Sequence, residues 1–275
     1  MTMDFRISVV IPSLAERRLF LKECLRSVFS QSLTPLEVIV VGHNLVIPAE
    51  YSRFVNLLKT HEKSNAAESR NHGARRAIGD YIAFLDDDDI WPSNYLQSNL
   101  PKISDRILDL GLAEIQNFSI DDQGNQHIEK SHHNKDLNQI FHLNPGIVGS
   151  NMIVKRDSFI KIGGFREALS TSEDKSLVID FICGGFAVDF LGEAPAWIRN
   201  HSSFRLSNSV YLLIGVRSFY KLFKKKMPLA SRLHNLNKIS KLEFENFPTA
   251  INWVKRAVVF LYIHSVLNLL RLVRC

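Results

Sequence analysis

Short apolar runs alternate with amphipathic segments along the first 85 residues of the chain. Ile7 to Ile11 and Leu36 to Val41 are apolar runs typical of buried strands. Pro12 follows the first run directly, and Gly42 follows the second. Between the runs, Glu16 to Gln31 carries apolar residues at helical spacing, which predicts a helix with one apolar face. This order of elements predicts a βαβ unit with parallel strands.

The pattern continues to residue 85 and changes after residue 110. The next expected elements are a strand over 54–58, a helix over 65–78 and a strand over 81–85. Beyond them we expect a hairpin over 112–130, a strand over 149–154, a helix over 173–183 and strands over 186–191 and 196–200. Together these elements predict an α/β fold with a mostly parallel central sheet flanked by helices.

Charge separates the last part of the chain from the rest. Residues 211–275 carry 12 lysines and arginines against two acids, whereas residues 1–210 carry 22 against 26. Apolar blocks lie between these basic residues, and the longest, Ala257 to Leu270, is shorter than the roughly 20 residues that a membrane-spanning helix needs. We therefore expect a domain over 1–210 and a helical basic extension over 211–275 that associates with an anionic membrane surface and not with nucleic acid. The alternative is a helix packed on the domain.

Composition narrows the class of protein. With 45% hydrophobic and 23% charged residues, the chain is neither disordered nor fibrous. Its three cysteines, Cys24, Cys183 and Cys275, form no closely spaced pair, so we expect neither a zinc module nor a disulfide framework. No long apolar stretch follows a basic segment near the start, so no secretory leader is expected. A cytoplasmic protein at the inner face of the cell membrane fits these features.

Four carboxylates, Asp86 to Asp89, directly follow the strand over 81–85. They repel one another, so a cation or basic partners should lie beside them. Oxygen ligands beyond the carboxyl end of a strand in an α/β sheet favour a hard cation such as Mg²⁺ or Mn²⁺, completed by phosphate and water. The alternative is a solvated acidic turn that caps a helix begun at Pro92 and Ser93.

A second pair of acids, Glu173 and Asp174, opens the helix over 173–183. Acids are common in a first helical turn, because capping and the helix dipole both favour them. On the residues alone, a structural role is therefore favoured for this pair.

Several motifs stand in a fixed order along residues 7–205. They are ISVVIPS at 7–13, LRSVFSQ at 25–31, EVIVV at 37–41, SRNHGA at 69–74, GDYIAFLDDDDIW at 79–91, GGF at 163–165 and ED at 173–174. In this order they resemble the family 2 inverting glycosyltransferases. The resemblance implies the GT-A, or nucleotide-diphospho-sugar transferase, fold, with a nucleotide-binding half over about 1–110 and an acceptor half over 111–210. It also implies metal-dependent transfer from a nucleotide-sugar donor to a glycan or lipid-linked acceptor in surface-polysaccharide synthesis.

The resemblance gives each acid a role. The family's D-x-D motif falls on Asp86, Asp87 and Asp88. Asp88 would ligate the Mn²⁺ or Mg²⁺ ion that bridges the donor diphosphate, Asp86 would lie near the metal or the ribose, and Asp87 would help to bind the donor. Asp174 would be the base that takes the acceptor's proton, and Glu173 would orient the acceptor.

The resemblance also implies further contacts to the donor. Pro12 and Ser13, at the end of the first strand, would line the nucleobase and ribose pocket, and Arg70 would contact the nucleotide. His201 and Arg205 stand in a segment similar to the family's R-x-H-x-x-S motif. His201 would be an additional metal ligand, and Arg205 would hold a phosphate.

The chain departs from the family where the nucleobase is read. The usual V-D-D-G-S is replaced by Val40 to Asn44, which holds no carboxylate, so donor identity is open and His43 or Asn44 is the candidate substitute. Two other functions are a non-catalytic nucleotide-sugar-binding or membrane-binding module and a nucleotidyltransferase. The second is disfavoured because no glycine-rich phosphate loop follows the first strand. Donor hydrolysis or transfer with Mn²⁺ would distinguish an enzyme from a binding module.

Overall fold

A seven-stranded sheet with the strand order β3-β2-β1-β4-β8-β5-β9 is the main sheet of the computed structural model. The structure describes residues 5–121, 123, 126–129, 135–200 and 210–272. The strands are β1 (Ile7–Pro12), β2 (Glu37–Gly42), β3 (Val55–Lys59), β4 (Tyr81–Phe84), β5 (Leu110–Leu112), β8 (Met152–Lys155) and β9 (Val188–Phe190). β1 pairs in parallel with β2 and β4, β2 with β3, and β5 with β9. β8 runs antiparallel to β4 and β5. The predicted, mostly parallel sheet is therefore confirmed.

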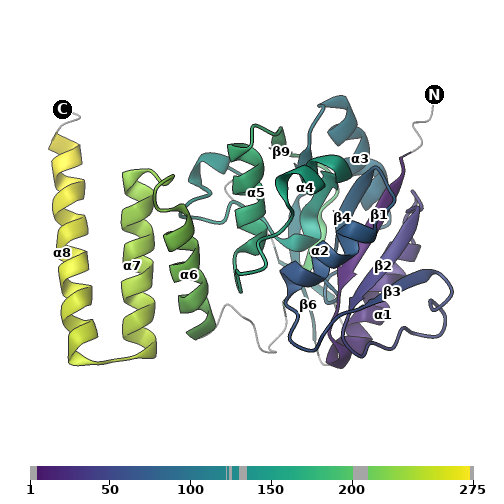
Figure 1. Ribbon diagram of the computed structural model, residues 1–275, viewed down its shortest axis with the longest axis horizontal. Coiled ribbons are helices and arrows are strands. Elements are labelled where there is room, and N and C mark those ends of the chain that lie inside the picture. The colour runs from purple at the N-terminus through teal and green to yellow at the C-terminus, as the bar shows by residue number, and fades with distance from the viewer. Residues whose placement is uncertain (1–4, 122, 124–125, 130–134, 201–209, 273–275) are drawn as a thin grey trace. The chain divides into compact units, whose positions relative to one another are not determined.

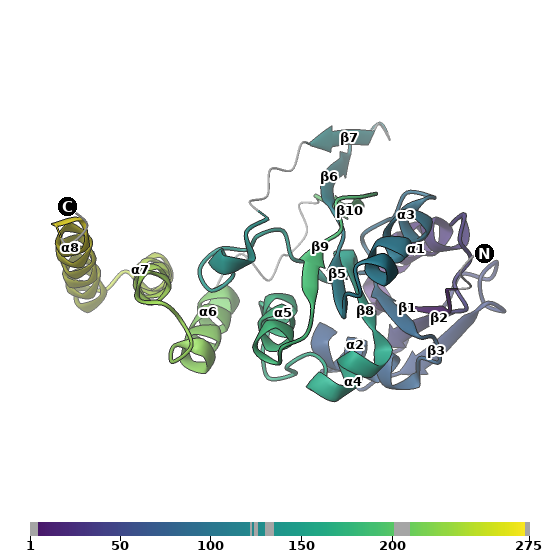
Figure 2. The same ribbon diagram turned by 90° about the horizontal axis from the view of Figure 1, so that it is seen from above.

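The chain divides into two units, and the sheet lies in the first. This unit comprises Met1–Lys135, Gly146–Glu167 and Glu173–Ser202. Its helices are α1 (Arg18–Phe29), α2 (Ala66–Arg76), α3 (Tyr95–Asp105), α4 (Arg156–Ile162) and α5 (Glu173–Cys183), as Figure 1 shows. A second sheet joins β6 (Ile115–Ile120), β7 (Gln126–Glu129) and β10 (Ala196–Arg199), and Figure 2 shows it beside the larger one. β6 and β7 form the predicted hairpin.

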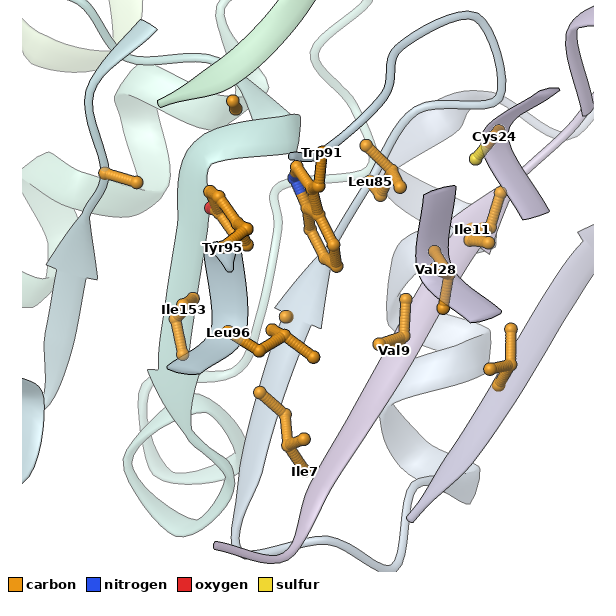
Figure 3. Packing of buried hydrophobic residues seen from close by; sticks show 14 of the residues in the cluster. Ile7, Val9, Ile11, Cys24, Val28, Leu85, Trp91, Tyr95, Leu96 and Ile153 are labelled. Atoms are coloured by element: carbon orange, nitrogen blue, oxygen red, sulfur yellow. The ribbon is translucent and has the colours of Figure 1, made fainter. Parts of the chain in front are cut away.

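Alternate residues of β1 face opposite sides of the large sheet. Ile7, Val9 and Ile11 join the core cluster that also contains apolar residues of α1 and α3 (Figure 3). Val10 faces α2, where a Cβ atom added to Gly73 would lie 2.4 Å from Val10 Cγ1. α2 can therefore pack this closely on the sheet because residue 73 is glycine.

The second unit holds three successive helices, α6 (Val210–Phe223), α7 (Leu229–Asn246) and α8 (Ala250–Leu272). Within it, α6 packs on α7 and α7 packs on α8, in the order that Figure 1 shows. Buried aromatic side chains, Phe219 and Phe223, anchor α6. No helix in the described part of the chain combines the length and the apolar character that crossing a membrane requires.

The sequence pattern missed some elements. The pattern predicted a helical extension over 211–275 but did not resolve α7 within it, because Ser231, Asn235 and Ser240 are buried along α7 together with Leu233, which obscures an apolar stripe. The strand expected over 149–154 begins with a 3₁₀ turn, and the strand itself starts at Met152.

Candidate active site

The acidic run lies where two neighbouring parallel strands end. β1 ends at Pro12 and β4 at Phe84, and Leu85 continues the ladder by donating its N–H to the carbonyl of Val10 at 3.1 Å. Ser13 and Asp86 consequently follow adjacent strands at the same edge of the sheet. This is the edge at which open α/β sheets bind their ligands.

Asp87 fastens the loop after β1 to the acidic run. Its Oδ2 accepts hydrogen bonds from Ser13 Oγ at 2.7 Å and from the N–H of Leu14 at 3.1 Å, and its Oδ1 lies 3.1 Å from Arg17 Nη1. Burial raises the pKa of Asp87 to about 6, although Arg17 and Ser13 oppose the shift. Ser13 and Asp87 thus lie together, and their roles at the donor stay predictions.

Asp89 is buried and fixes the other end of the run. It accepts hydrogen bonds from Ser150 Oγ at 2.5 Å and from the N–H of Arg199 at 2.9 Å. Burial, followed by the charges of Asp88 and Asp86, raises its pKa well above the usual value. Asp89 therefore acts as a buried hydrogen-bonding group that holds the side chain of Ser150 and the backbone of Arg199.

Two residues that the sequence did not single out hold the run in place. Besides donating its hydroxyl to Asp89, Ser150 accepts the N–H of Asp86 at its Oγ at 3.0 Å and the Nε1–H of Trp91 at its carbonyl at 2.9 Å. Arg199 donates from Nε to the carbonyl of Asp88 at 2.9 Å. Trp91 itself is buried, so it is a packing residue of this loop.

Asp86 and Asp88 are the acids of the run with the greatest access to solvent, at 30% and 15% side-chain exposure. Their oxygens suit a hard cation, and Mg²⁺ and Mn²⁺ commonly take one or two protein carboxylates. Within the described ranges, no group of three or more His, Cys, Asp or Glu side chains could hold a metal ion. A metal-binding role for Asp86 and Asp88 stays a prediction. The predicted His201 and Arg205 lie outside the described residues.

Arg70 connects the acidic run to the second acid pair. It is buried on α2, where Nη2 lies 2.5 Å from Asp86 Oδ1 and Nη1 lies 3.0 Å from Glu173 Oε1. A Cβ atom on Gly149 would lie 2.5 Å from Nη2, so the absence of a side chain at this position makes room for the guanidinium. The ring of Phe165 lies 5.3 Å from the guanidinium carbon. Contact between Arg70 and a nucleotide stays a prediction.

The start of α2 explains why Arg70 lies at this edge of the sheet. Asn65 caps the helix by accepting the N–H of Glu68 at 2.9 Å, and Glu68 accepts the N–H of Asn65 at 3.0 Å. This capping box fixes the helix start just beyond β3. Arg70 consequently lies in the second turn, near the carboxyl ends of the strands.

Glu173 and Asp174 form the first turn of α5, as predicted. Burial, and then the charge of Glu173, raises the pKa of Asp174 to about 7, against the opposing effects of the Lys175 N–H and of Arg70. A carboxylate with a pKa near neutral is well suited to accept a proton from a substrate hydroxyl. Arg70 thus joins the acidic run, the predicted metal site, to the helix turn that holds the predicted base.

A separate polar pocket of about 350 Å³ lies at the carboxyl end of β3. It is lined by Lys59, Thr60, His61, Ser64, Glu68, His72, Arg75 and Glu167. None of these residues is among the predicted site residues. Nearby, His43 Nδ1 lies 3.0 Å from the carbonyl of Thr60, while Asn44 has a left-handed backbone.

Comparison with known sequences gives one family match and several partial relatives. The sequence model described as "Glycosyl transferase family 2" matches residues 8–163. An uncharacterized glycosyltransferase of Haemophilus influenzae is 28% identical over 182 residues, covering 64% of this chain and 62% of that protein. The amylovoran biosynthesis glycosyltransferase AmsB of Erwinia amylovora is 36% identical over 112 residues, covering 36% of each chain. The chain therefore spans less than two thirds of the length of these relatives.

Solved structures share the fold at low sequence identity. TarS 1-349 of S. aureus, in complex with UDP-GlcNAc, superposes with a TM-score of 0.60 at 17% identity, covering 87% of this chain and 73% of that chain. The mannosyltransferase PcManGT from Pyrobaculum calidifontis, in complex with GDP-Man and Mn²⁺, gives a TM-score of 0.63 at 14% identity, covering 97% and 76%. The predicted GT-A fold is confirmed.

Proposed function

Because the chain belongs to glycosyl transferase family 2, we propose that it transfers a sugar, with inversion, from a nucleotide-sugar donor to a hydroxyl of a glycan or lipid-linked acceptor. The relative AmsB is named for amylovoran biosynthesis, which supports a role in cell-surface polysaccharide synthesis. The observation that carries the proposal is the Arg70 bridge, which joins Asp86 of the acidic run to Glu173 beside the candidate base.

The donor side is built from the ends of β1 and β4. Pro12 and Ser13 line the place for the nucleobase and ribose, and Asp87 keeps their loop against the acidic run. Asp88, with Asp86, would hold Mn²⁺ or Mg²⁺. A bound divalent ion supplies Lewis-acid stabilisation of the negative charge on the departing diphosphate.

The acceptor side is built from the start of α5. Asp174 accepts the proton of the attacking hydroxyl as the oxygen approaches the anomeric carbon, and its pKa of about 7 makes it a base near neutral pH. Glu173, held by Arg70, orients the acceptor. A single displacement of this kind inverts the anomeric centre and forms no covalent sugar-enzyme intermediate.

Two substitutions test these roles, with a third as a control. In the full chain with Mn²⁺ and a panel of nucleotide sugars, we expect Asp174→Asn to slow transfer by about 10²- to 10⁴-fold while nucleoside diphosphate binding is retained. Asp88→Ala should lose transfer together with metal-dependent nucleotide binding. Asp157→Asn, at an almost fully exposed position on α4, should change neither. Wild-type rates for Asp174→Asn would refute its role, and a wild-type chain that binds donors without turnover would identify a binding module.

We also propose that the second unit attaches to the anionic inner face of the cell membrane. Its net charge is strongly positive, with 12 basic and two acidic residues over 211–275. Large apolar side chains of α8 are exposed, namely Ile251, Trp253, Val254, Val258, Phe260, Leu261 and Tyr262. An exposed apolar helix surface together with basic charge favours binding at a lipid interface.

Vesicle flotation tests this attachment. The wild-type chain should float with vesicles that contain phosphatidylglycerol and remain behind with phosphatidylcholine alone. Val254→Asp combined with Leu261→Asp should abolish flotation because both changes place charge on the exposed surface of α8. The matched control places Asp at Leu19 and Ile78, which are exposed in the first unit, and should float normally. Equal flotation of the two double variants would refute the proposal.

A further inference from the structure

Among the residues that the structure describes, three guanidinium groups bond to the acidic run, and they differ in their access to solvent. The side chains of Arg70 and Arg199 are 3% and 5% exposed, whereas that of Arg17 is 28% exposed. Arg70 and Arg199 are therefore enclosed by protein. Arg17 is the most solvent-exposed of the three.

Arg17 occupies the position of a cation between two acids. Its Nη1 lies 2.8 Å from Asp88 Oδ2 and 3.1 Å from Asp87 Oδ1. Charge-assisted bonds of this length neutralise much of the negative charge of the carboxylates. Asp88 is also the proposed metal ligand, and a divalent ion beside the guanidinium would be repelled by it. The Arg17 guanidinium and a divalent ion would consequently compete for the carboxylate of Asp88.

The structure allows Arg17 to leave without unfolding its loop. The loop is tied to Asp87 by Ser13 Oγ and the N–H of Leu14, at 2.7 and 3.1 Å. These two bonds do not depend on the guanidinium. Rotation of the Arg17 side chain would thus break its bond to Asp88, while Asp87 keeps two hydrogen bonds.

We propose that Arg17 is a tethered competitor of the divalent ion, so that the ion binds tightly only together with the donor diphosphate. This inference rests on the proposed function and concerns how its metal is admitted. Without donor, Arg17 neutralises Asp88. With donor, the diphosphate adds negative charge that attracts the ion and can accept hydrogen bonds from the displaced guanidinium. Metal and nucleotide binding are therefore positively coupled through Arg17.

Electron paramagnetic resonance titration of Mn²⁺ measures this coupling directly on the full chain. The Kd for Mn²⁺ is determined alone, with UDP and with GDP, for the wild type, Arg17→Met and Arg17→Lys. We expect Arg17→Met to bind Mn²⁺ alone at least about tenfold more tightly than the wild type, and the nucleotide to improve its affinity much less. Arg17→Lys keeps the positive charge and should remain close to the wild type. Arg17→Gln serves as a second neutral variant if thermal melting shows that Arg17→Met is unfolded.

The outcomes separate this inference from the proposed function. The role of Arg17 is overturned if a neutral variant binds Mn²⁺ alone with wild-type or weaker affinity while the wild type binds Mn²⁺ in the presence of nucleotide. That result would still support the metal site of the proposed function. Failure of every protein to bind Mn²⁺, with or without nucleotide, overturns both the inference and the metal dependence of the proposed function.

Discussion

Removing Arg70 tests whether the buried bridge holds the two acid groups together. Arg70→Met keeps most of the side-chain volume but removes the bonds to Asp86 and Glu173. Breaking a buried ion pair costs about 3–5 kcal/mol because charge is left uncompensated. Both carboxylates retain some contact with solvent, at 30% and 16% exposure, so we expect the lower end, about 3 kcal/mol. At about 2–4 °C per kcal/mol, the melting temperature should fall by roughly 6–12 °C.

A neighbouring arginine on the same helix provides the control. Arg75 is 59% exposed and lies 3.8 Å from the exposed carboxylate of Glu167, so Arg75→Met should cost less than about 1 kcal/mol. Urea unfolding, followed by tryptophan fluorescence because Trp91 is buried, gives both free energies. Arg70→Lys should recover only part of the loss, since an ammonium group lacks the fork that reaches two carboxylates. A loss in Arg70→Met no larger than that in Arg75→Met would refute the reasoning.

Three further results are expected. The kcat/KM for transfer should rise with pH through about 7, because Asp174 must lose its proton to act as a base. Burial and the charge of Glu173 raise the pKa of Asp174 to about 7. Glu173→Gln should move this rise to lower pH, and an unchanged profile would count against Asp174 as the base. Asp89→Ala should destabilise the fold by about 1–3 kcal/mol in urea, because Ser150 Oγ and the N–H of Arg199 would lose their buried acceptor. Wild-type stability would show that these two bonds do not hold the run. Gly149→Ala should lower the free energy of unfolding in urea by about 1–3 kcal/mol, because the alanine Cβ would lie 2.5 Å from Arg70 Nη2. Wild-type stability would mean that the Arg70 guanidinium has room to move.

The sequence predicted those features that depend on local patterns. The apolar runs that became β1, β2 and β4, and the helix that became α5, follow from short-range periodicity and from the residues that end each run. Repulsion within the acidic run also predicted positive partners, and Arg17 and Arg70 bond to it. The general location of the candidate site could therefore be predicted from the sequence.

The particular partners could not be predicted because they come from distant parts of the chain. Ser150 is 61 residues from Asp89, and Arg199 is 110 residues from it. Spacing along the sequence carries no signal for such pairs, since tertiary pairing brings them together: β4 pairs with β8, and Ile90 forms a bridge with Trp197. The contact of Arg17 with Asp88 also could not be predicted, because Arg17 is one of several charged residues at a helix start and lies 71 residues from Asp88.

The most direct test of the account is a crystal structure of the chain with Mn²⁺ and a nucleoside diphosphate, with the ion located by its anomalous signal. The account predicts an anomalous peak at the carboxylate of Asp88, with the diphosphate bound to it on the side of the sheet edge where Asp174 opens α5. A diphosphate bound elsewhere, for instance in the polar pocket lined by Lys59 and Arg75, with no manganese at Asp88, would contradict it.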